Sequence, residues 1–346
     1  MASTWNFDLE QLADHLRTHV SGAAGAMTLE SISGGQSNPT FFVSFDDRRL
    51  VLRKKPPGQL LPSAHAIDRE YRIMGALEGS GVPVPKMVHY CSDPDVVGTP
   101  FYVMERLDGR VFSDCTLPGI EPGERRAMYF AMGETLARLH GIDWRAMQLE
   151  DYGKAGSYFQ RQIARWTKQW DLARTKEIPE LDWIAQWLAN NIPEGDLTRI
   201  SHGDFRIGNL MFHPQEPRVV GVLDWELSTL GHPLADLAYS ALVWRLKPDE
   251  YMGVREMDLD TLGIPTEHEY VRHYMRLAPE TGELKPFHIA FALFRLAVIF
   301  EGIAVRSASG TATAVNAEKV GTLSTAFARR AAEVITDAGS THNSTK

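Results

Sequence analysis

The sequence predicts an α+β fold with a small, β-rich N-terminal lobe and a larger, mainly helical C-terminal lobe. The chain has 346 residues, which is more than one simple hydrophobic core usually contains. Its first third holds short runs of β-branched and aromatic residues, and its remainder is dominated by the apolar spacing of amphipathic helices. We place the lobes at residues 1–107 and 108–338 and expect a small, polar, disordered tail at 339–346.

In the N-terminal lobe, Thr40–Phe45 and Arg49–Arg53 have the composition of strands, and Asp46-Asp47 between them has that of a turn. Apolar residues at helical spacing predict a helix over Ala64–Glu78, and Phe101–Met104 is typical of a buried strand. Further on, the pattern predicts two short strands and seven helices: strands near Leu210–His213 and Val219–Trp225, and helices near Pro122–Gly141, Ser157–Leu172, Leu181–Asn190, Leu234–Trp244, Glu267–Arg276, Pro286–Ser307 and Ala314–Thr336.

Composition and charge exclude several classes of protein. A net charge of −8 argues against a nucleic-acid-binding surface, which is basic. The two cysteines show no metal-binding spacing, which favours a reducing compartment, and we expect the cytoplasm. The N-terminus up to His19 indicates an amphipathic helix rather than a signal peptide. Phe287–Val305 is apolar but contains Arg295 and Glu301, so we interpret it as a buried helix and not as a membrane span.

The stretch that indicates chemistry is His202-Gly203-Asp204-Phe205-Arg206-Ile207-Gly208-Asn209. Phosphoryl transfer needs a carboxylate that orients the attacking hydroxyl and oxygen ligands for magnesium. Asp204 can accept the hydroxyl proton, and Asn209 can offer its amide oxygen to the metal. Asp224 ends the second predicted strand, so a hairpin would bring it back beside Asn209. The spacing resembles the H-R-D-x-x-x-x-N and D-F-G motifs of protein kinases.

Each of these aspartates alone could be an ordinary turn residue, but the joint pattern is far more specific. His202 is more typical of a structural support for the loop than of a catalytic group. Arg206 can offset charge on the γ-phosphoryl oxygens, although a surface arginine is the alternative. Asp236 could cap a helix or brace the catalytic loop, and we favour bracing over metal binding. No activation segment is recognisable, which disfavours a protein kinase.

The nucleotide-binding residues are predicted in the N-terminal lobe. A Gly-rich turn between strands lets backbone N–H groups approach phosphates, and Gly34, Gly35, Gln36 and Ser37 form such a turn. By resemblance to protein kinases, Arg53 would hold the α- and β-phosphates and pair with Glu70, with Lys54 and Lys55 as alternatives to Arg53.

The strand at Phe101–Met104 would lead to the segment that binds the base of the nucleotide. Backbone groups near Glu105 and Leu107 would bond to adenine, and Met104 would pack behind the ring. An ordinary buried strand is the alternative.

Taken together, these motifs resemble the aminoglycoside phosphotransferase (choline kinase-like) superfamily. More narrowly, the chain is similar to the kinase domain fused to some acyl-CoA dehydrogenases and to free-standing bacterial relatives of that domain. The resemblance extends from about Ile32 to Phe327. It rests on blocks at Val51–Gly58, Leu60-Leu61-Pro62-Ser63-Ala64-His65, Phe101–Glu105, Glu150-Asp151-Tyr152-Gly153-Lys154, His202–Asn209 and Leu223-Asp224-Trp225-Glu226-Leu227-Ser228-Thr229-Leu230-Gly231.

The resemblance implies a protein-kinase-like fold, ATP as cosubstrate, two Mg²⁺ ions and transfer of the γ-phosphoryl group to a hydroxyl. The narrower group implies a hydroxyacyl-CoA acceptor, such as a 4-hydroxyacyl-CoA, and separate acyl-CoA-metabolising enzymes as partners. No nucleic acid or membrane is expected to bind. An aminoglycoside or other small-molecule kinase is the first alternative, and a nucleotide-binding pseudokinase or interaction module is the second.

Charge weakly favours the anionic acceptor. Helical segments carry Arg161, Arg165, Lys168, Arg295 and Arg306, which suit a CoA-like ligand unless they form solvated faces or internal ion pairs. An acidic cluster favours a cationic acceptor instead: Glu256, Asp258 and Asp260.

Overall fold

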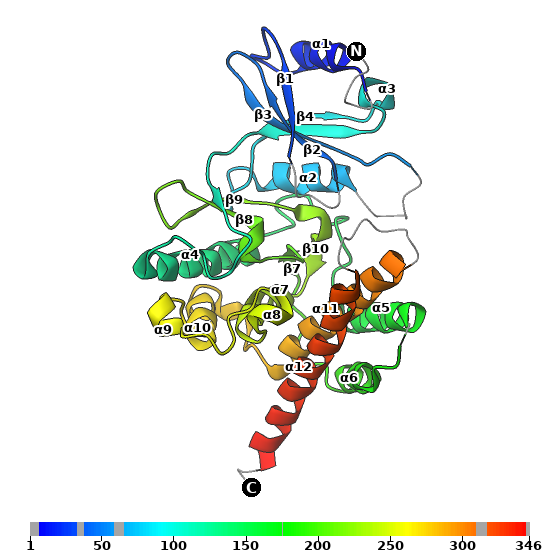
Figure 1. Cartoon of the computed structure of the whole chain (residues 1–346), viewed down its shortest axis with the longest axis vertical. Coiled ribbons are helices and arrows are strands. Elements are labelled where there is room, and N and C mark those ends of the chain that lie inside the picture. Colours follow the sequence, from blue (N-terminus) through cyan, green and yellow to red (C-terminus); the bar gives the residue numbers. More distant parts are fainter. Residues whose placement is uncertain (1–6, 33–37, 59–65, 175, 309–316, 344–346) are drawn as a thin grey trace. The chain divides into compact units, whose positions relative to one another are not determined.

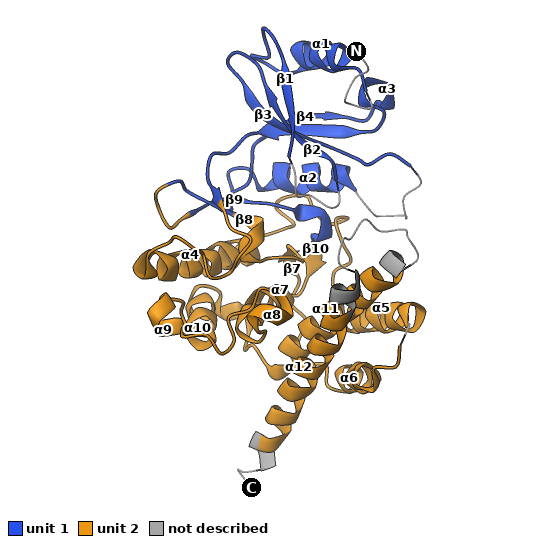
Figure 2. Ribbon diagram, viewed as in Figure 1, with its two compact units in different colours: residues 1–110, 211–214, 219–228 blue, residues 111–210, 215–218, 229–346 orange. Residues whose placement is uncertain are grey.

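The computed structural model describes residues 7–32, 38–58, 66–174, 176–308 and 317–343. Figure 1 shows the helices and strands of the chain. The chain divides into two compact units, which Figure 2 shows in different colours. The first unit comprises residues 1–110, 211–214 and 219–228, and the second comprises residues 111–210, 215–218 and 229–346. The first is built on a sheet and the second is mainly helical, which agrees with the predicted α+β class.

The first unit contains a five-stranded antiparallel sheet of order β1-β2-β3-β5-β4. Alternate residues of its strands face opposite sides of the sheet. Leu50 and Leu52 join a core cluster with Leu12 and Leu16 of α1, whereas Arg53 lies on the other face with α2. The elements of this unit are α1 (Leu9–His19), β1 (Thr28–Ser31), β2 (Thr40–Ser44), β3 (Arg49–Lys54), α2 (Ile67–Leu77), β4 (Met87–Cys91), α3 (Pro94–Val97) and β5 (Phe101–Glu105).

Two later segments also belong to the first unit. They come from β8 (Leu210–Phe212) and β9 (Val219–Val222), which form a hairpin, and β6 (Arg110–Val111) lies at the division between the units. The Val222 N–H donates to the Pro83 carbonyl at 2.8 Å, so the strand that precedes Asp224 is tied to the turn before β4. Asp224 therefore belongs to the same unit as Arg53, although the two residues are far apart in the sequence.

The second unit is a helical assembly around α11. This helix packs on α5, α6, α7 and α12, while α4 packs against α10. A short antiparallel ribbon of β7 (Arg199–Ser201) and β10 (Thr229–Gly231) precedes the functional loop and α7. The helices are α4 (Pro122–Gly141), α5 (Tyr158–Ala173), α6 (Pro179–Asn190), α7 (Pro233–Ser240), α8 (Pro248–Tyr251), α9 (Leu259–Leu262), α10 (Glu267–Leu277), α11 (Pro286–Ala308) and α12 (Ala317–Asn343).

Helix α11 is the one described helix that is long and apolar enough to cross a membrane by length and composition. Its 286–305 stretch has a mean hydropathy of 1.9, but 61% of the most apolar window is buried inside the protein. Phe291, Leu293, Phe294 and Ala297 are all at most 1% exposed. This burial is typical of the central helix of a globular unit, as the sequence predicted.

One prediction about the C-terminus is wrong. Residues 339–343 continue α12, whereas the sequence predicted a disordered tail over 339–346. The Ser340 hydroxyl donates to the Thr336 carbonyl one turn earlier, and the Thr336 hydroxyl donates to that of Ala332. Small polar side chains that bond back to the helix in this way are compatible with its continuation, which a composition argument does not capture.

Candidate functional site

Three polar groups surround Asp204, which lies in the loop between β7 and β8, and all of them belong to the second unit. Tyr239 of α7 donates its hydroxyl to Asp204 Oδ1, and Asn209 Nδ2 donates to Oδ2 at 2.7 Å. Arg206 Nε lies 3.5 Å from the same Oδ2. Asn209 Nδ2 also donates to the Asp204 carbonyl at 2.9 Å. Because the amide nitrogen makes both bonds, the amide oxygen of Asn209 is the atom suited to a metal.

Asp236 holds the start of this loop from α7. Its side chain is buried, and it accepts the His202 N–H at 2.6 Å and the Gly203 N–H at 2.9 Å. His140 Nε2 lies 3.4 Å from Asp236 Oδ2. Burial acts to raise the pKa of Asp236, but His140, His202 and Ser201 outweigh it and keep that pKa below its usual value. The backbone therefore occupies both oxygens of Asp236.

Three further contacts fix the loop backbone. Gly203 has φ +81°, a conformation that glycine adopts far more readily than other residues. The fully buried His202 accepts the Asp204 N–H at its Nδ1, at 3.2 Å. Arg295 of α11 donates to the Gly203 carbonyl at 2.8 Å. The loop that carries the Asp204 carboxylate is thus held by hydrogen bonds to His202 and Arg295.

A second polar cluster lies in the first unit, around Arg53 of β3. Arg53 Nε is 3.2 Å from Glu70 Oε2 of α2, and a terminal nitrogen of Arg53 is 3.2 Å from Asp224 Oδ1 and 3.8 Å from Glu226 Oε2. Tyr102 of β5 donates to Glu70 at 3.0 Å and Asn38 donates to it at 2.9 Å. Three carboxylates thus surround one guanidinium, so the cluster carries a formal negative excess that suits a cation.

Asp224 has an unusual backbone conformation, with φ 65° and ψ 67° in the left-handed region. Aspartate tolerates this region better than most residues, and such conformations gather at functional sites. About a third of its side chain is exposed, so its carboxylate stays accessible beside Arg53. Asp224 and Asn209 belong to different units.

Glu70 is almost completely buried, and its charge depends on its neighbours. Burial raises the pKa of Glu70 to about 7, against the opposing effects of Arg53 and the Tyr102 hydrogen bond, with a further rise from Asp224 and Glu226. For Arg53, burial acts to lower the pKa, but the surrounding carboxylates outweigh it and raise the pKa above its usual value. The guanidinium therefore stays charged.

The raised pKa of Glu70 predicts a pH-dependent stability. Between about pH 4.5 and 7 the folded state binds more protons at Glu70 than the unfolded state does. The contribution of Glu70 is therefore fully present below pH 4.5 and is lost as pH rises through 7, by about 3 kcal/mol of unfolding free energy. We expect Glu70→Gln to flatten this slope in urea unfolding at several pH values. Glu30→Gln, at an exposed site, is the control and should leave the slope unchanged.

Comparison with known proteins identifies the family of the chain. The phosphotransferase enzyme family matches residues 28–272. The chain belongs to this family. Its relatives include acyl-CoA dehydrogenase family member 10 of Mus musculus, at 45% identity over 94% of this chain and 30% of that protein. Family member 11 of Homo sapiens is 43% identical over 86% of this chain and 39% of that protein. The chain thus spans only about a third of the length of these curated relatives.

Solved structures give the same assignment. A Ralstonia eutropha protein, provisionally assigned as an aminoglycoside phosphotransferase, superposes with a TM-score of 0.88 at 44% identity, over 96% of this chain and 99% of that one. Aminoglycoside phosphotransferase APH(4)-Ia, in complex with AMP-PNP and hygromycin B, gives 0.62 at 16% identity, over 93% and 98%. The chain is a phosphotransferase with a kinase-like fold, and its predicted similarity to the acyl-CoA dehydrogenase-linked kinase domains is confirmed.

In this phosphotransferase, the two lysines that follow Arg53 make other contacts. Lys54 is buried, donates to the Val97 carbonyl and lies 4.6 Å from the Phe7 ring centre, and burial lowers its pKa. The backbone of Lys55 pairs with Pro100 and Thr99. Of the three candidates, Arg53 is the one that the structure brings to Glu70.

The segment predicted to bind adenine lies in β5 and directly after it. Met104 lies in β5 opposite Val51, and the Glu105 N–H already donates to the Lys86 carbonyl at 2.9 Å. Among the described residues, no hydrogen bond involves the Leu107 N–H, which follows the strand. The Gly-rich turn predicted to bind phosphates, Gly34, Gly35, Gln36 and Ser37, lies outside the described residues.

Sequence reasoning missed four residues of the two clusters. Tyr239 lies three residues after Asp236, one helical turn on, so helical spacing could have indicated it. Asn38 directly follows the predicted Gly-rich turn. Glu226 lies two residues after Asp224 in a quoted motif, and Tyr102 is opposite Arg53 in the sheet. Only the register of the strands reveals the last of these.

A mostly apolar pocket of the second unit adjoins the Asp204 loop. Arg206, Ile207 and Tyr239 contribute to its lining, and no lining residue carries a carboxylate. The remaining lining residues are apolar or weakly polar: Cys115, Tyr129, Met132, Ser240, Leu242, Val243, Leu246, Tyr251, Met252 and Leu296.

Proposed function

We propose that this phosphotransferase transfers the γ-phosphoryl group of ATP to the hydroxyl of a hydroxyacyl-CoA, such as a 4-hydroxyacyl-CoA. The observation that carries the chemistry is the Asp204 carboxylate, which Tyr239 and Asn209 hold on a braced loop with Arg206 beside it. A carboxylate that is held in place in this way can orient the attacking hydroxyl. Such positioning is the main contribution that a protein makes to phosphoryl transfer. The cytoplasm is the proposed location.

In the proposed reaction the acceptor oxygen forms a bond to the γ-phosphorus, and the bond from that phosphorus to the β–γ bridging oxygen breaks. The acceptor proton passes to Asp204, and ADP leaves with the electron pair of the broken bond. Arg206 offsets negative charge on the transferred group. Its pKa is held above its usual value, because Asp204, Tyr251 and Tyr239 outweigh the effect of burial, so it remains a cation.

Arg53, supported by Glu70, is the proposed group for the nucleotide phosphates. Asn209 and Asp224 are the proposed ligands of two Mg²⁺ ions, on the strength of their motif spacing. Their oxygen atoms fit this metal: the Asn209 nitrogen is already engaged by Asp204, and the Asp224 carboxylate is partly exposed. Bound magnesium would neutralise phosphate charge. Solved complexes of APH(4)-Ia with AMP-PNP and with ADP support a nucleoside triphosphate as donor.

One observation supports an acyl-CoA acceptor over an aminoglycoside. The relatives at 41–45% identity are named acyl-CoA dehydrogenases, so acyl-CoA chemistry accompanies them. Separate acyl-CoA-metabolising enzymes are the proposed partners.

Several of the charged residues that were considered for acceptor binding already contact other residues of the protein. Glu256 pairs with Lys247 at 2.6 Å, and Asp258 caps α9 through Thr261. Because these two carboxylates already have partners, the acidic cluster is a poorer candidate for binding a cationic acceptor. Among the cations, Arg295 bonds to the Gly203 carbonyl and Arg161 to that of Lys154, whereas Arg165 and Lys168 are exposed. Exposed cations remain the better candidates for the phosphates of CoA.

An acceptor screen by mass spectrometry tests the proposal. The chain is incubated with ATP, Mg²⁺ and one acceptor at a time: short- and medium-chain hydroxyacyl-CoAs, the matching free hydroxy acids, aminoglycosides, choline and sugars. We expect phosphate on a hydroxyacyl-CoA and little on the free acid, because truncated substrates lose the binding energy of the part removed. Phosphate on an aminoglycoside would keep the phosphotransferase and overturn the acceptor. ATP binding without transfer to any acceptor would favour a nucleotide-binding module instead.

A further inference from the structure

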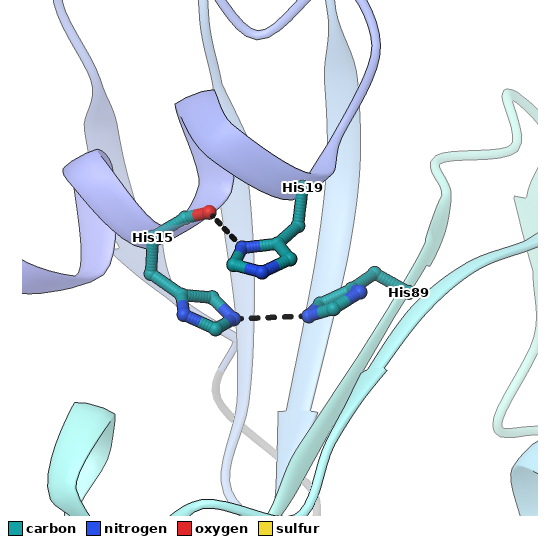
Figure 3. A group of neighbouring side chains, drawn as sticks. All are labelled: His15, His19 and His89. Atoms are coloured by element: carbon teal, nitrogen blue, oxygen red, sulfur yellow. Dashed lines mark hydrogen bonds between the residues drawn. The ribbon is translucent and has the colours of Figure 1, made fainter.

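Three histidines converge in the first unit, on the face of its sheet opposite Arg53. His15 and His19 come from α1 and His89 comes from β4, as Figure 3 shows. His15 Nε2 and His89 Nε2 are 2.9 Å apart, and one nitrogen from each ring lies within 4.8 Å of the other two. The three rings lie close together, with centres 4.2 Å apart for His15 and His19 and 5.1 Å apart for each with His89.

The fold explains the convergence. Residues four apart in a helix project from the same face, so His15 and His19 are neighbours. Leu12 and Leu16 anchor α1 in the core cluster on one face of the sheet. His89 is paired with Val103, a member of the same cluster, and therefore lies on the face that α1 covers. Strand β4 is at the edge of the sheet, which leaves the three rings near solvent.

This position separates the histidines from the nucleotide side. Arg53 is paired with Tyr102 in the sheet, and both contact Glu70 on the face that α2 covers. The histidines are on the opposite face. They therefore do not belong to the Arg53 cluster, and the proposed phosphoryl transfer does not use them.

The hydrogen bonds prepare the ring nitrogens to act as ligands. His19 Nδ1 lies 2.8 Å from the His15 carbonyl, which can only accept, so Nδ1 carries the proton and Nε2 carries a lone pair. A carbonyl that accepts from the distal N–H is the usual support of a metal-bound histidine. Between His15 and His89, one Nε2 must donate to the other, and a cation could replace that shared proton.

The surroundings of His15 and His89 also favour the uncharged imidazole, which is the form that binds a metal. Burial, then the neighbouring His15 and His19, lowers the pKa of His89 to about 4. Burial and then His19 lower the pKa of His15, and Asp93 opposes this. Phe101 closes the inner side, with its ring centre 5.7 Å from that of His15 and 6.3 Å from that of His89.

We propose that His15, His19 and His89 form a binding site for Zn²⁺ or a similar divalent transition metal. Zinc is bound tetrahedrally by imidazole at about 2.0–2.1 Å, which requires nitrogens about 3.3 Å apart. The observed separations, 2.9 Å for one pair and at most 4.8 Å for all, approach this spacing. His19 is exposed, so water can complete the fourth position. The metal would fasten α1 to the edge strand.

The test uses the full chain, freed of metal by a chelator, with excess Mg²⁺ and no nucleotide. Magnesium prefers oxygen ligands and saturates carboxylate sites without competing for imidazole. Zn²⁺ binding is measured by calorimetry, and Co²⁺ is used as an optical probe of coordination. We expect one equivalent of Zn²⁺ to bind, the Tm to rise, and Co²⁺ to give the strong visible absorption of a four-coordinate site. No binding of either metal would overturn the proposal.

Matched histidine variants distinguish this site from adventitious binding. His19→Gln changes an exposed residue and should fold normally, and His268→Gln changes an exposed histidine of α10 in the other unit. His19→Gln should weaken Zn²⁺ binding by more than about 100-fold, because losing an outer-shell partner alone costs 10- to 100-fold. His268→Gln should bind like the parent chain. Equal binding by both variants would overturn the proposal, and His89→Gln provides an independent repeat.

Discussion

Replacing Asp204 with alanine should abolish turnover while ATP binding stays near normal. Asp204 is the one carboxylate that the braced loop presents between Tyr239 and Asn209. A positioned general base contributes about 10²–10⁴-fold to rate, so kcat should fall by at least that factor. The nucleotide contacts proposed for Arg53 are in the other unit and are unchanged by the substitution. Single-turnover phosphoryl transfer and calorimetric titration with ATP measure the two effects separately.

The result requires variants that keep the fold intact. Asp204→Asn preserves the shape and the chance to bond to Tyr239, and it should lose turnover like the alanine variant. Asp249→Asn changes an exposed carboxylate of α8 in the same unit and should retain full activity. Unchanged turnover in both Asp204 variants would remove this residue from the mechanism. A parallel loss of ATP affinity would indicate a role in nucleotide binding instead.

Local sequence signals predicted much of the fold. The helix over Pro122–Gly141 was predicted with the bounds that the structure has, because a proline at its start and a glycine at its end mark it. The strands at residues 40 and 49 were also predicted. By contrast, β1, β4, β7 and β10 were missed. These strands are only three to five residues long, and most residues of β1 and β4 are exposed or partly buried. Their pairing with neighbouring strands of the sheet defines them, and that pairing leaves little trace in such short segments.

The same distinction applies to the functional residues, because some are marked by local sequence and others only by the fold. The motif from His202 to Asn209 is contiguous, so its residues could be predicted from spacing alone. The contact between Arg53 and Asp224 joins residues 171 positions apart, and only the fold supplies it. The partners of Glu70 were hidden for the same reason, because Tyr102 reaches it through strand register and Asn38 through a loop. The roles of the predicted residues in catalysis stay predictions.

Replacing Asp236 with asparagine should lower the unfolding free energy by about 3–5 kcal/mol. The buried carboxylate accepts one backbone N–H at each oxygen, from His202 and Gly203. An amide has one oxygen, so its NH₂ group would face an N–H donor and leave that donor buried without a partner. Urea unfolding followed by circular dichroism measures the loss, and Asp204→Asn, at a partly exposed carboxylate, should cost far less.

The pH dependence separates this bracing role from a simple loss of packing. The pKa of Asp236 is held below its usual value, chiefly because His140 outweighs the effect of burial. Its stabilisation is therefore present above about pH 4 and is lost as pH falls through the lowered pKa. The difference in stability between the parent chain and Asp236→Asn should be full at pH 7 and shrink only in strong acid. A difference that is the same at every pH would mean that the charge of Asp236 does not hold the loop, and that a cavity or clash explains the loss.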